Sequence, residues 1–154
     1  MKAILPGSYD PITLGHLEII RLAAKKYDEV FVTAFINPDK KYLYTTRERL
    51  EMLRLATADI PNVRVDAYPG RVVDYMRERG IERIVKGYRN DADLEYERRQ
   101  AEYNLREGGY ETELILAEAE YSHLSSTLAR ERIQLGEPLE EILPKPVIEF
   151  IKKH

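Results

Sequence analysis

The sequence predicts an α/β fold with one parallel five-stranded sheet, doubly wound so that helices cover both of its faces. Two observations predict it. Short apolar and β-branched runs alternate with helical patterns along nearly the whole chain, and no linker-like stretch divides its 154 residues. Strands that alternate with helices pair in parallel, because each connection crosses back over the sheet through a helix. We therefore expect a single domain over residues 1–154.

Three strands and two helices are expected in the first half. Residues 3–5 are apolar, residues 29–35 are rich in β-branched and aromatic side chains, and residues 63–67 alternate, so each run predicts a strand. A helical pattern covers residues 17–26, and Thr13 can cap it. Thr45 and Glu48 form a capping-box pattern for a second helix, which ends near residues 60–61. The residues expected on its inner face are Leu50, Leu53, Ala56 and Thr57.

The second half continues the alternation. A short helix with Val72 on its apolar side stops at Gly80, a strand follows at residues 83–86, and residues 87–90 form a turn. A highly charged helix covers residues 92–106, and a fifth strand covers residues 114–117. The next helix begins near Ser126 and ends at Gly136. Pro138 and Pro146 are each expected to open a small terminal helix.

Composition excludes several functions. A formal net charge of −3 gives no reason to expect nucleic-acid binding, and the absence of cysteine excludes disulfides and thiolate chemistry and fits a cytoplasmic protein. We expect no signal peptide and no membrane span, because no apolar run is long enough. Neither a P-loop nor a GxSxG pattern occurs, and the three histidines lack a metal-ligand spacing.

Residues 6–16, PGSYDPITLGH, join the first expected strand to the first helix. A strand that turns tightly into a helix directs the free N–H groups of that helix at one point, where an anion binds well. Gly7 allows close approach of a ligand to the backbone, and Gly15 leaves room for His16. The segment therefore predicts a phosphate site. The alternative is a capped helix whose histidine has only a structural role, but such a helix would require only part of this pattern.

Polar groups from distant segments should meet at this point. Ligands of doubly wound folds bind beyond the carboxyl ends of the strands. His16 follows the first expected strand, Lys40 the second, Arg89 the fourth and residues 125–127 the fifth. The donors and cations expected at this edge are Ser8, His16, Lys40, Lys86, Arg89, Ser125, Ser126, Thr127 and Arg130. Such a set suits phosphoryl or nucleotidyl transfer, in which the protein positions reactants and stabilises negative charge.

Each of these residues also has an ordinary explanation. Lys40 and Lys41 could be a solvated surface pair, and Lys86 and Arg89 could belong to a surface turn. Ser125 could be an ordinary N-cap. For His16, the positive end of the helix disfavours protonation, so we expect a neutral imidazole that donates a hydrogen bond to a phosphoryl oxygen.

Three motifs resemble those of the nucleotidyltransferase superfamily. Gly7 to His16 match G-[ST]-[FY]-D-P-x-T-x-G-H, which contains the (T/H)xGH signature. Residues 38–41 resemble a PxKK loop, and residues 124–130 resemble (I/L)SSTxxR. Five segments occur in an order and at spacings similar to those of bacterial phosphopantetheine adenylyltransferases: PGSYDPITLGH, PDKK, YTTRER, KGYRNDADLEYE and YSHLSST.

This resemblance implies a Rossmann-like nucleotidyltransferase domain that transfers AMP from ATP to 4′-phosphopantetheine, giving dephospho-coenzyme A and pyrophosphate. It also implies Mg²⁺ carried with ATP, a cytoplasmic homohexamer and feedback inhibition by coenzyme A. The implied catalytic residues are His16, Lys40 and Arg89. The implied ATP-binding residues are Ser8, Tyr9, His16, Gly87, Tyr88, Arg89, Glu97, Tyr121, Ser122, His123, Leu124, Ser125, Ser126 and Thr127. The implied residues for the pantetheine substrate are Ser8, Lys40, Val72 and Lys86.

Two departures from the family pattern bear on the acceptor. The usual RGLR is Lys86-Gly87-Tyr88-Arg89 here, so the charge at residue 86 is kept but the bidentate fork is lost. Ser8 replaces the commoner threonine and keeps the hydroxyl. A related enzyme with another acceptor, nicotinamide mononucleotide or glycerol phosphate, and a non-catalytic nucleotide-binding regulator remain open as alternatives.

Overall fold

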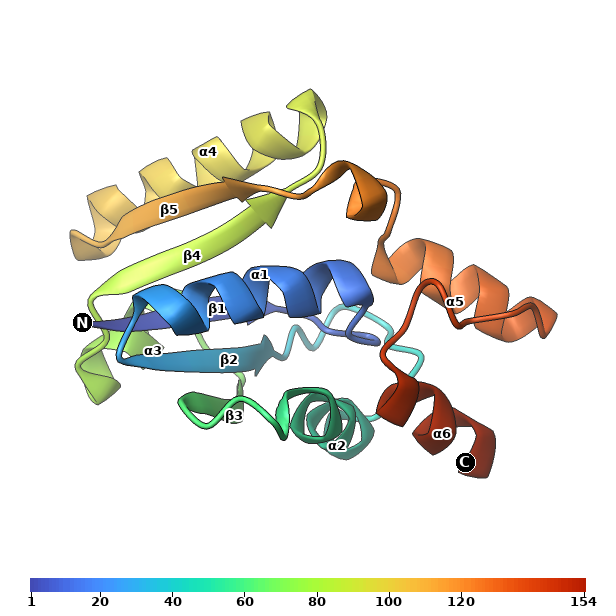
Figure 1. Cartoon of the computed structure of the whole chain (residues 1–154). Helices are drawn as coiled ribbons and strands as arrows, with labels where there is room; N and C mark the ends of the chain where they lie inside the picture. The colour runs from blue at the N-terminus through green and yellow to red at the C-terminus, as the bar shows by residue number, and fades with distance from the viewer.

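The computed structural model describes all 154 residues and contains the predicted sheet (Figure 1). Its five strands are all parallel and lie in the order β3-β2-β1-β4-β5. The strands are β1 (Lys2–Gly7), β2 (Glu29–Phe35), β3 (Val63–Tyr68), β4 (Arg83–Tyr88) and β5 (Glu111–Leu116). The α-helices are α1 (Leu14–Lys26), α2 (Thr46–Thr57), α3 (Val72–Arg79), α4 (Asp91–Gly108), α5 (Ser126–Leu135) and α6 (Lys145–Lys153), and a 3₁₀ turn, η1, covers Ala119–Tyr121. None of these helices has the length and apolar character that a bilayer crossing requires.

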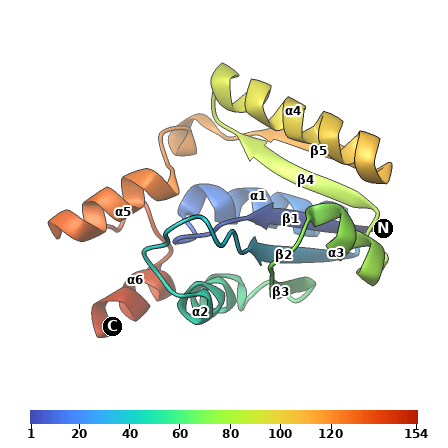
Figure 2. The ribbon, with the colours of Figure 1, turned by 180° about the vertical axis from the view of Figure 1, so that it is seen from behind.

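Two apolar cores lie on opposite faces of the sheet, as the doubly wound prediction requires. Alternate residues of β1 separate them: Ala3 and Leu5 belong to the larger core, whereas Ile4 belongs to the smaller one. The larger core packs under α1, α2 and α6, and the smaller one packs under α3. Figure 2 shows α3 and α4 in front of the sheet and α1 behind it.

Most helix boundaries follow from local chemistry that the sequence displays. Thr13 and Thr45 close capping boxes at α1 and α2, which satisfies N–H groups that a helix start leaves free. Gly80, Gly109 and Gly136 follow α3, α4 and α5 in the left-handed conformation that glycine adopts without a steric cost.

Three sequence expectations are wrong in detail. Gly87 and Tyr88 belong to β4 rather than to a turn, because the strand pairs with β5 up to Leu116. No helix starts at Pro138. A turn covers residues 140–142 between the buried Leu139 and Leu143, and Pro144 disfavours helical backbone at the residue before it.

The third difference concerns the inner face of α2. Leu50 is only partly buried, and Arg49 occupies the neighbouring buried position with 1% of its surface exposed. A charged residue in the core stripe is unusual, because arginine is rarely fully buried unless it is paired. Because Arg49 rather than Leu50 is the buried residue, its guanidinium reaches the β1–α1 turn and donates a hydrogen bond to the Ser8 carbonyl.

The strand order reverses direction between β1 and β4, and the chain leaves these two neighbours toward opposite faces. Such a switch point opens a crevice at the carboxyl ends of the strands. In both ribbon views α5 lies beyond these ends, with its N-terminal end nearer to the sheet than its C-terminal end (Figures 1 and 2). The fold therefore brings the β1–α1 turn, the end of β4 and the start of α5 together.

Candidate active site

A cleft of about 550 Å³ occupies the switch point. Its wall comes from the β1–α1 turn, the loop after β2, the end of β4 and the start of α5. The predicted site residues that line it are Ser8, Tyr9, His16, Lys40, Lys86, Gly87, Tyr88, Arg89, Tyr121, Leu124, Ser125, Ser126 and Thr127. Residues more than 100 positions apart in the sequence thus face one volume, as the convergence argument predicts.

His16 is held in one orientation by the N-cap of its own helix. Its Nδ1 accepts a hydrogen bond from the Thr13 backbone N–H at 3.0 Å and lies 3.1 Å from Thr13 Oγ1. The ring of Tyr9 packs against it at an interplanar angle of 68°. Because Nδ1 acts as an acceptor, the proton of the neutral imidazole resides on Nε2. His16 therefore presents a fixed N–H donor on the side away from Thr13.

The surroundings of His16 keep it neutral. Burial, together with the positive charges of Lys86 and Arg89, lowers its pKa from 6.5 to about 4, and burial is the largest cause. A lowered pKa agrees with the expectation from the sequence, although burial rather than the helix end is the main cause. At neutral pH the side chain can donate a hydrogen bond but cannot serve as a general acid of ordinary strength.

Two helix N-termini face the cleft. Thr13 and Gly15 line it at the start of α1, and Ser125 to Thr127 line it at the start of α5. Ser125 caps α5 by accepting the Leu128 N–H at 3.0 Å. Helix N-termini carry partial positive charge and free N–H groups, so this pair provides a setting for a polyanionic ligand such as a triphosphate.

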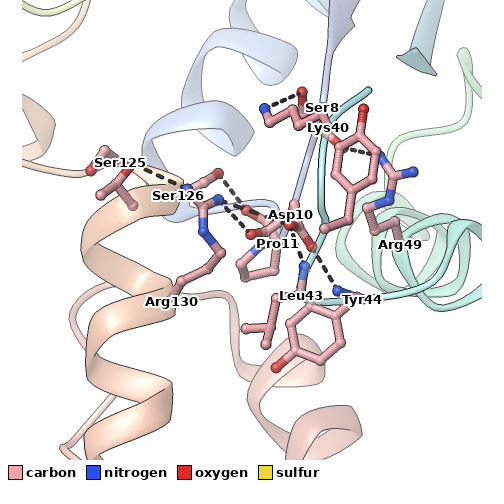
Figure 3. A network of polar contacts seen from close by, with 12 residues as sticks. Ser8, Asp10, Pro11, Lys40, Leu43, Tyr44, Arg49, Ser125, Ser126 and Arg130 are labelled. Carbon is pink, nitrogen blue, oxygen red and sulfur yellow. Dashed lines mark hydrogen bonds and ion pairs between the residues drawn. The ribbon is translucent and has the colours of Figure 1, made fainter. Parts of the chain in front are cut away.

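The β1–α1 turn is held from both sides (Figure 3). Both carboxylate oxygens of Asp10 accept backbone N–H groups, from Leu43 at 2.8 Å and from Tyr44 at 2.9 Å. From the other side, Ser126 Oγ donates to the Pro11 carbonyl at 2.9 Å and Arg130 donates to the Asp10 carbonyl at 3.0 Å. The turn that precedes His16 is thereby fixed to both the loop after β2 and α5.

Arg89 connects β4, α4 and the segment before α5. Its Nε donates to Asp93 Oδ2 at 2.8 Å, and its Nη1 donates to the Leu124 carbonyl at 3.3 Å. Asn90 caps α4 by accepting the Asp93 N–H. The guanidinium is thus positioned at the cleft wall by a carboxylate that also neutralises part of its charge.

A second, smaller cleft of about 280 Å³ adjoins the first. Ser8 and Lys86 line both clefts, whereas Val72 and Glu97 line only the smaller one. Lys86 Nζ lies 3.3 Å from Glu97 Oε2 and donates to the Pro6 carbonyl at 3.2 Å. A ligand that extends from one cleft into the other would pass Ser8 and Lys86.

Some predicted site residues do not face the larger cleft. Ser122 and His123 line neither cleft, and Ser122 Oγ instead donates to the Ala119 carbonyl at 2.9 Å. Arg130 lies outside both clefts because its guanidinium is engaged by Asp10 and Thr127. Glu97 belongs to the smaller cleft and is held by Lys86.

Sequence reasoning missed three residues that support the site: the buried Arg49, the carboxylate of Asp93 and the side chain of Tyr96. Tyr96 lines both clefts although it lies on the charged helix α4. The spacing of Arg49 with Leu53 and Ala56 on one helical stripe could have revealed its burial.

The donor set does not suit a resident metal ion, because no three His, Cys, Asp or Glu side chains cluster. The carboxylates near the cleft are already engaged: Asp10 by backbone N–H groups, Asp93 by Arg89 and Glu97 by Lys86. Divalent ions that bind few protein groups are commonly held by the phosphates of a substrate.

Comparison with known proteins agrees with this geometry. The model of the cytidylyltransferase-like family matches residues 4–132. The phosphopantetheine adenylyltransferase of Symbiobacterium thermophilum is 48% identical over 145 residues, which cover 94% of this chain and 90% of the relative. The enzyme of that name from Corynebacterium efficiens is 42% identical, and the match covers 99% of this chain and 97% of the relative. The one from Clostridium novyi is 41% identical, and the match covers 97% of this chain and 93% of the relative. The chain belongs to the phosphopantetheine adenylyltransferases, a family of nucleotidyltransferases within the cytidylyltransferase-like group.

Proposed function

We propose that the protein transfers AMP from ATP to 4′-phosphopantetheine, giving dephospho-coenzyme A and pyrophosphate. The observation that carries the proposal is the meeting of His16, Lys40 and two helix N-termini around one cleft. Membership of the family directs the choice of acceptor. The smaller cleft beside Ser8 and Lys86 offers space for the extended arm of such an acceptor.

The chemistry requires no protein nucleophile. A phosphate oxygen of the acceptor attacks the α-phosphorus of ATP, and the bond from that phosphorus to the pyrophosphate oxygen breaks. His16 Nε2–H donates to a non-bridging oxygen on which negative charge grows, and Lys40 neutralises charge between the reacting groups. Arg89, fixed by Asp93, faces the nucleotide phosphates. The substrate is ATP with its Mg²⁺, so the ion enters as part of the substrate.

The remaining assignments follow the walls of the two clefts. The residues that would contact ATP are Tyr9, Gly87, Tyr88, Tyr121 and Leu124, together with the hydroxyls of residues 125–127. Ser8 would contact both substrates. Lys86 and Val72 would contact the pantetheine arm, and Glu97 would act through Lys86.

Four further properties belong to the same proposal. We propose that residues 1–154 form one nucleotidyltransferase domain, that six copies assemble, that the enzyme works in the cytoplasm, and that coenzyme A inhibits it. Coenzyme A resembles the product, so it would compete for the cleft that the product leaves.

An acceptor panel tests the proposal. Purified protein with ATP and Mg²⁺ is supplied with 4′-phosphopantetheine, nicotinamide mononucleotide or glycerol 3-phosphate, and pyrophosphate release is measured. We expect turnover with phosphopantetheine alone. Turnover only with another acceptor would indicate a related enzyme, and ATP binding without pyrophosphate release from any acceptor would indicate a regulator.

A further inference from the structure

Arg49 is a buried cation that the proposed chemistry does not use. It lies on α2, 1% of its surface is exposed, and it lines neither cleft. Its Nη1 donates to the Ser8 carbonyl at 2.7 Å, and its Nη2 donates to Thr46 Oγ1 at 3.2 Å. The guanidinium stacks on the ring of Tyr42 at 3.9 Å.

The charge of Arg49 has no negative partner. No carboxylate oxygen forms an ion pair with it within 4.0 Å, and its Nε is buried without an acceptor. Two other cations of the site differ in this respect: Arg130 has Asp10 at 4.0 Å, and Lys86 has Glu97 at 3.3 Å. Burying an unpaired charge is costly, so an anion that binds nearby is attracted with little screening by water.

Arg49 and Lys40 approach the same residue from different elements (Figure 3). Lys40 Nζ donates to Ser8 Oγ at 3.1 Å, while Arg49 holds the Ser8 carbonyl. Both cations also contact the ring of Tyr42, Lys40 at 5.4 Å and Arg49 at 3.9 Å. Ser8 lies in the wall that the two clefts share, so two positive charges are fixed around the point where the clefts meet.

We propose that Arg49 is a positioning residue for the phosphate of the acceptor. It acts through Ser8, by fixing the backbone that presents the Ser8 hydroxyl, and through its uncompensated charge, which favours a dianion on the other side of that residue. The identity of the acceptor rests on the proposed function. A phosphate monoester suits this role because it carries close to two negative charges at neutral pH.

The test compares two ligands that differ only in the phosphate. Binding of 4′-phosphopantetheine and of pantetheine is measured by calorimetry for the wild type, Arg49→Met, Arg49→Lys and Arg130→Met. We expect Arg49→Met to weaken phosphopantetheine binding about tenfold or more, with pantetheine binding changed less than threefold. Arg49→Lys restores the charge, so it should recover most of the loss.

Arg130→Met is the matched control, because Arg130 also donates to a carbonyl of the β1–α1 turn but has a carboxylate nearby. We expect this substitution to affect the two ligands equally. The proposal is overturned if Arg49→Met weakens both ligands alike, if Arg49→Lys behaves like Arg49→Met, or if neither Arg49 variant folds. A wild type that does not bind phosphopantetheine would instead overturn the proposed function, and with it this role.

Discussion

The imidazole of His16 illustrates how one side chain is prepared for a single task. Thr13 supplies a backbone N–H that makes Nδ1 an acceptor, Tyr9 packs against the ring, and Lys86 and Arg89 disfavour protonation. The sequence predicted a neutral donor from the position of His16 at a helix start. It could not predict how the two cations affect the pKa of His16, because Lys86 lies on β4 and Arg89 directly after it, about 70 residues away in the chain.

Replacing His16 with alanine removes the donor while leaving the cleft in place. We expect His16→Ala to lower kcat by about two to three powers of ten, the usual effect of losing one transition-state donor. The KM for ATP should change much less. Steady-state kinetics on protein with a normal thermal unfolding curve provides the check, and a rise in the KM for ATP at unchanged kcat would contradict the role.

Titration of His16 tests its environment directly. We expect the histidine signal that disappears in His16→Ala to titrate in NMR spectra well below 6.5, near the pKa of about 4. Since folding lowers this pKa, the associated stabilisation is complete above pH 6.5 and is lost as the pH falls through about 4. A midpoint at or above 6.5 would show that the imidazole is exposed to solvent or paired with an acid.

Lys40 should act on the acceptor rather than on ATP, because its ammonium contacts Ser8 at the junction of the clefts. We expect Lys40→Ala to raise the KM for phosphopantetheine about tenfold, a loss of about 1.4 kcal/mol, with the KM for ATP nearly unchanged. Lys41→Ala is the matched control, since Lys41 is exposed and lines neither cleft. Equal effects of Lys40→Ala on both substrates would refute this assignment.

At the scale of elements, local signals predicted helices and strands well, and tertiary contacts explain the exceptions. The capping boxes of α1 and α2 and the glycines after α3, α4 and α5 lie within a few residues of the ends they determine. Extension of β4 through Tyr88 depends on pairing with β5, which local pattern cannot reveal. The turns after Pro138 depend on the burial of Leu139 and Ile142 against other elements.

The cap of α2 supports stability separately from catalysis. Thr45 Oγ1 accepts the Glu48 N–H at 3.1 Å, so Thr45→Ala should lower the free energy of unfolding by about 1 kcal/mol. For a chain of this length the Tm should fall by about 2–4 °C, measured by calorimetry. Arg47→Ala, an exposed change in the same helical turn, should have little effect on Tm. An equal loss in both variants would show that the capping box contributes nothing.

At the scale of the whole molecule, alternation of strands and helices predicted the sheet, and the sheet predicted where the site lies. The rule that ligands bind at the carboxyl ends of strands brought His16, Lys40, Arg89 and residues 125–127 together before any contact was known. The same rule could not distinguish residues that face the cleft from those that hold its wall. Arg130 illustrates this limit of the pattern: it belongs to the SSTxxR segment but binds the Asp10 carbonyl.

The proposed assembly is a property of the whole molecule that solution mass can test. Large apolar side chains remain exposed on the single chain, among them Leu105 on α4 and Leu116 at the end of β5. We expect sedimentation equilibrium to give six times the chain mass of 18.0 kDa. A stable monomer that turns over phosphopantetheine would refute the hexamer and leave the proposed reaction intact.

The wall shared by the two clefts has a practical consequence for inhibitor chemistry. The two clefts adjoin along one set of residues, Pro6, Gly7, Ser8, Lys86 and Tyr96, so the proposed binding sites of the two substrates lie next to each other. A bisubstrate compound that links adenosine to a pantetheine-like tail could then fill both at once. Once one half of the compound is bound, the short link would hold the other half at a high effective concentration near its own cleft. Small ligands that bind each cleft separately could likewise be joined by a linker that passes Ser8.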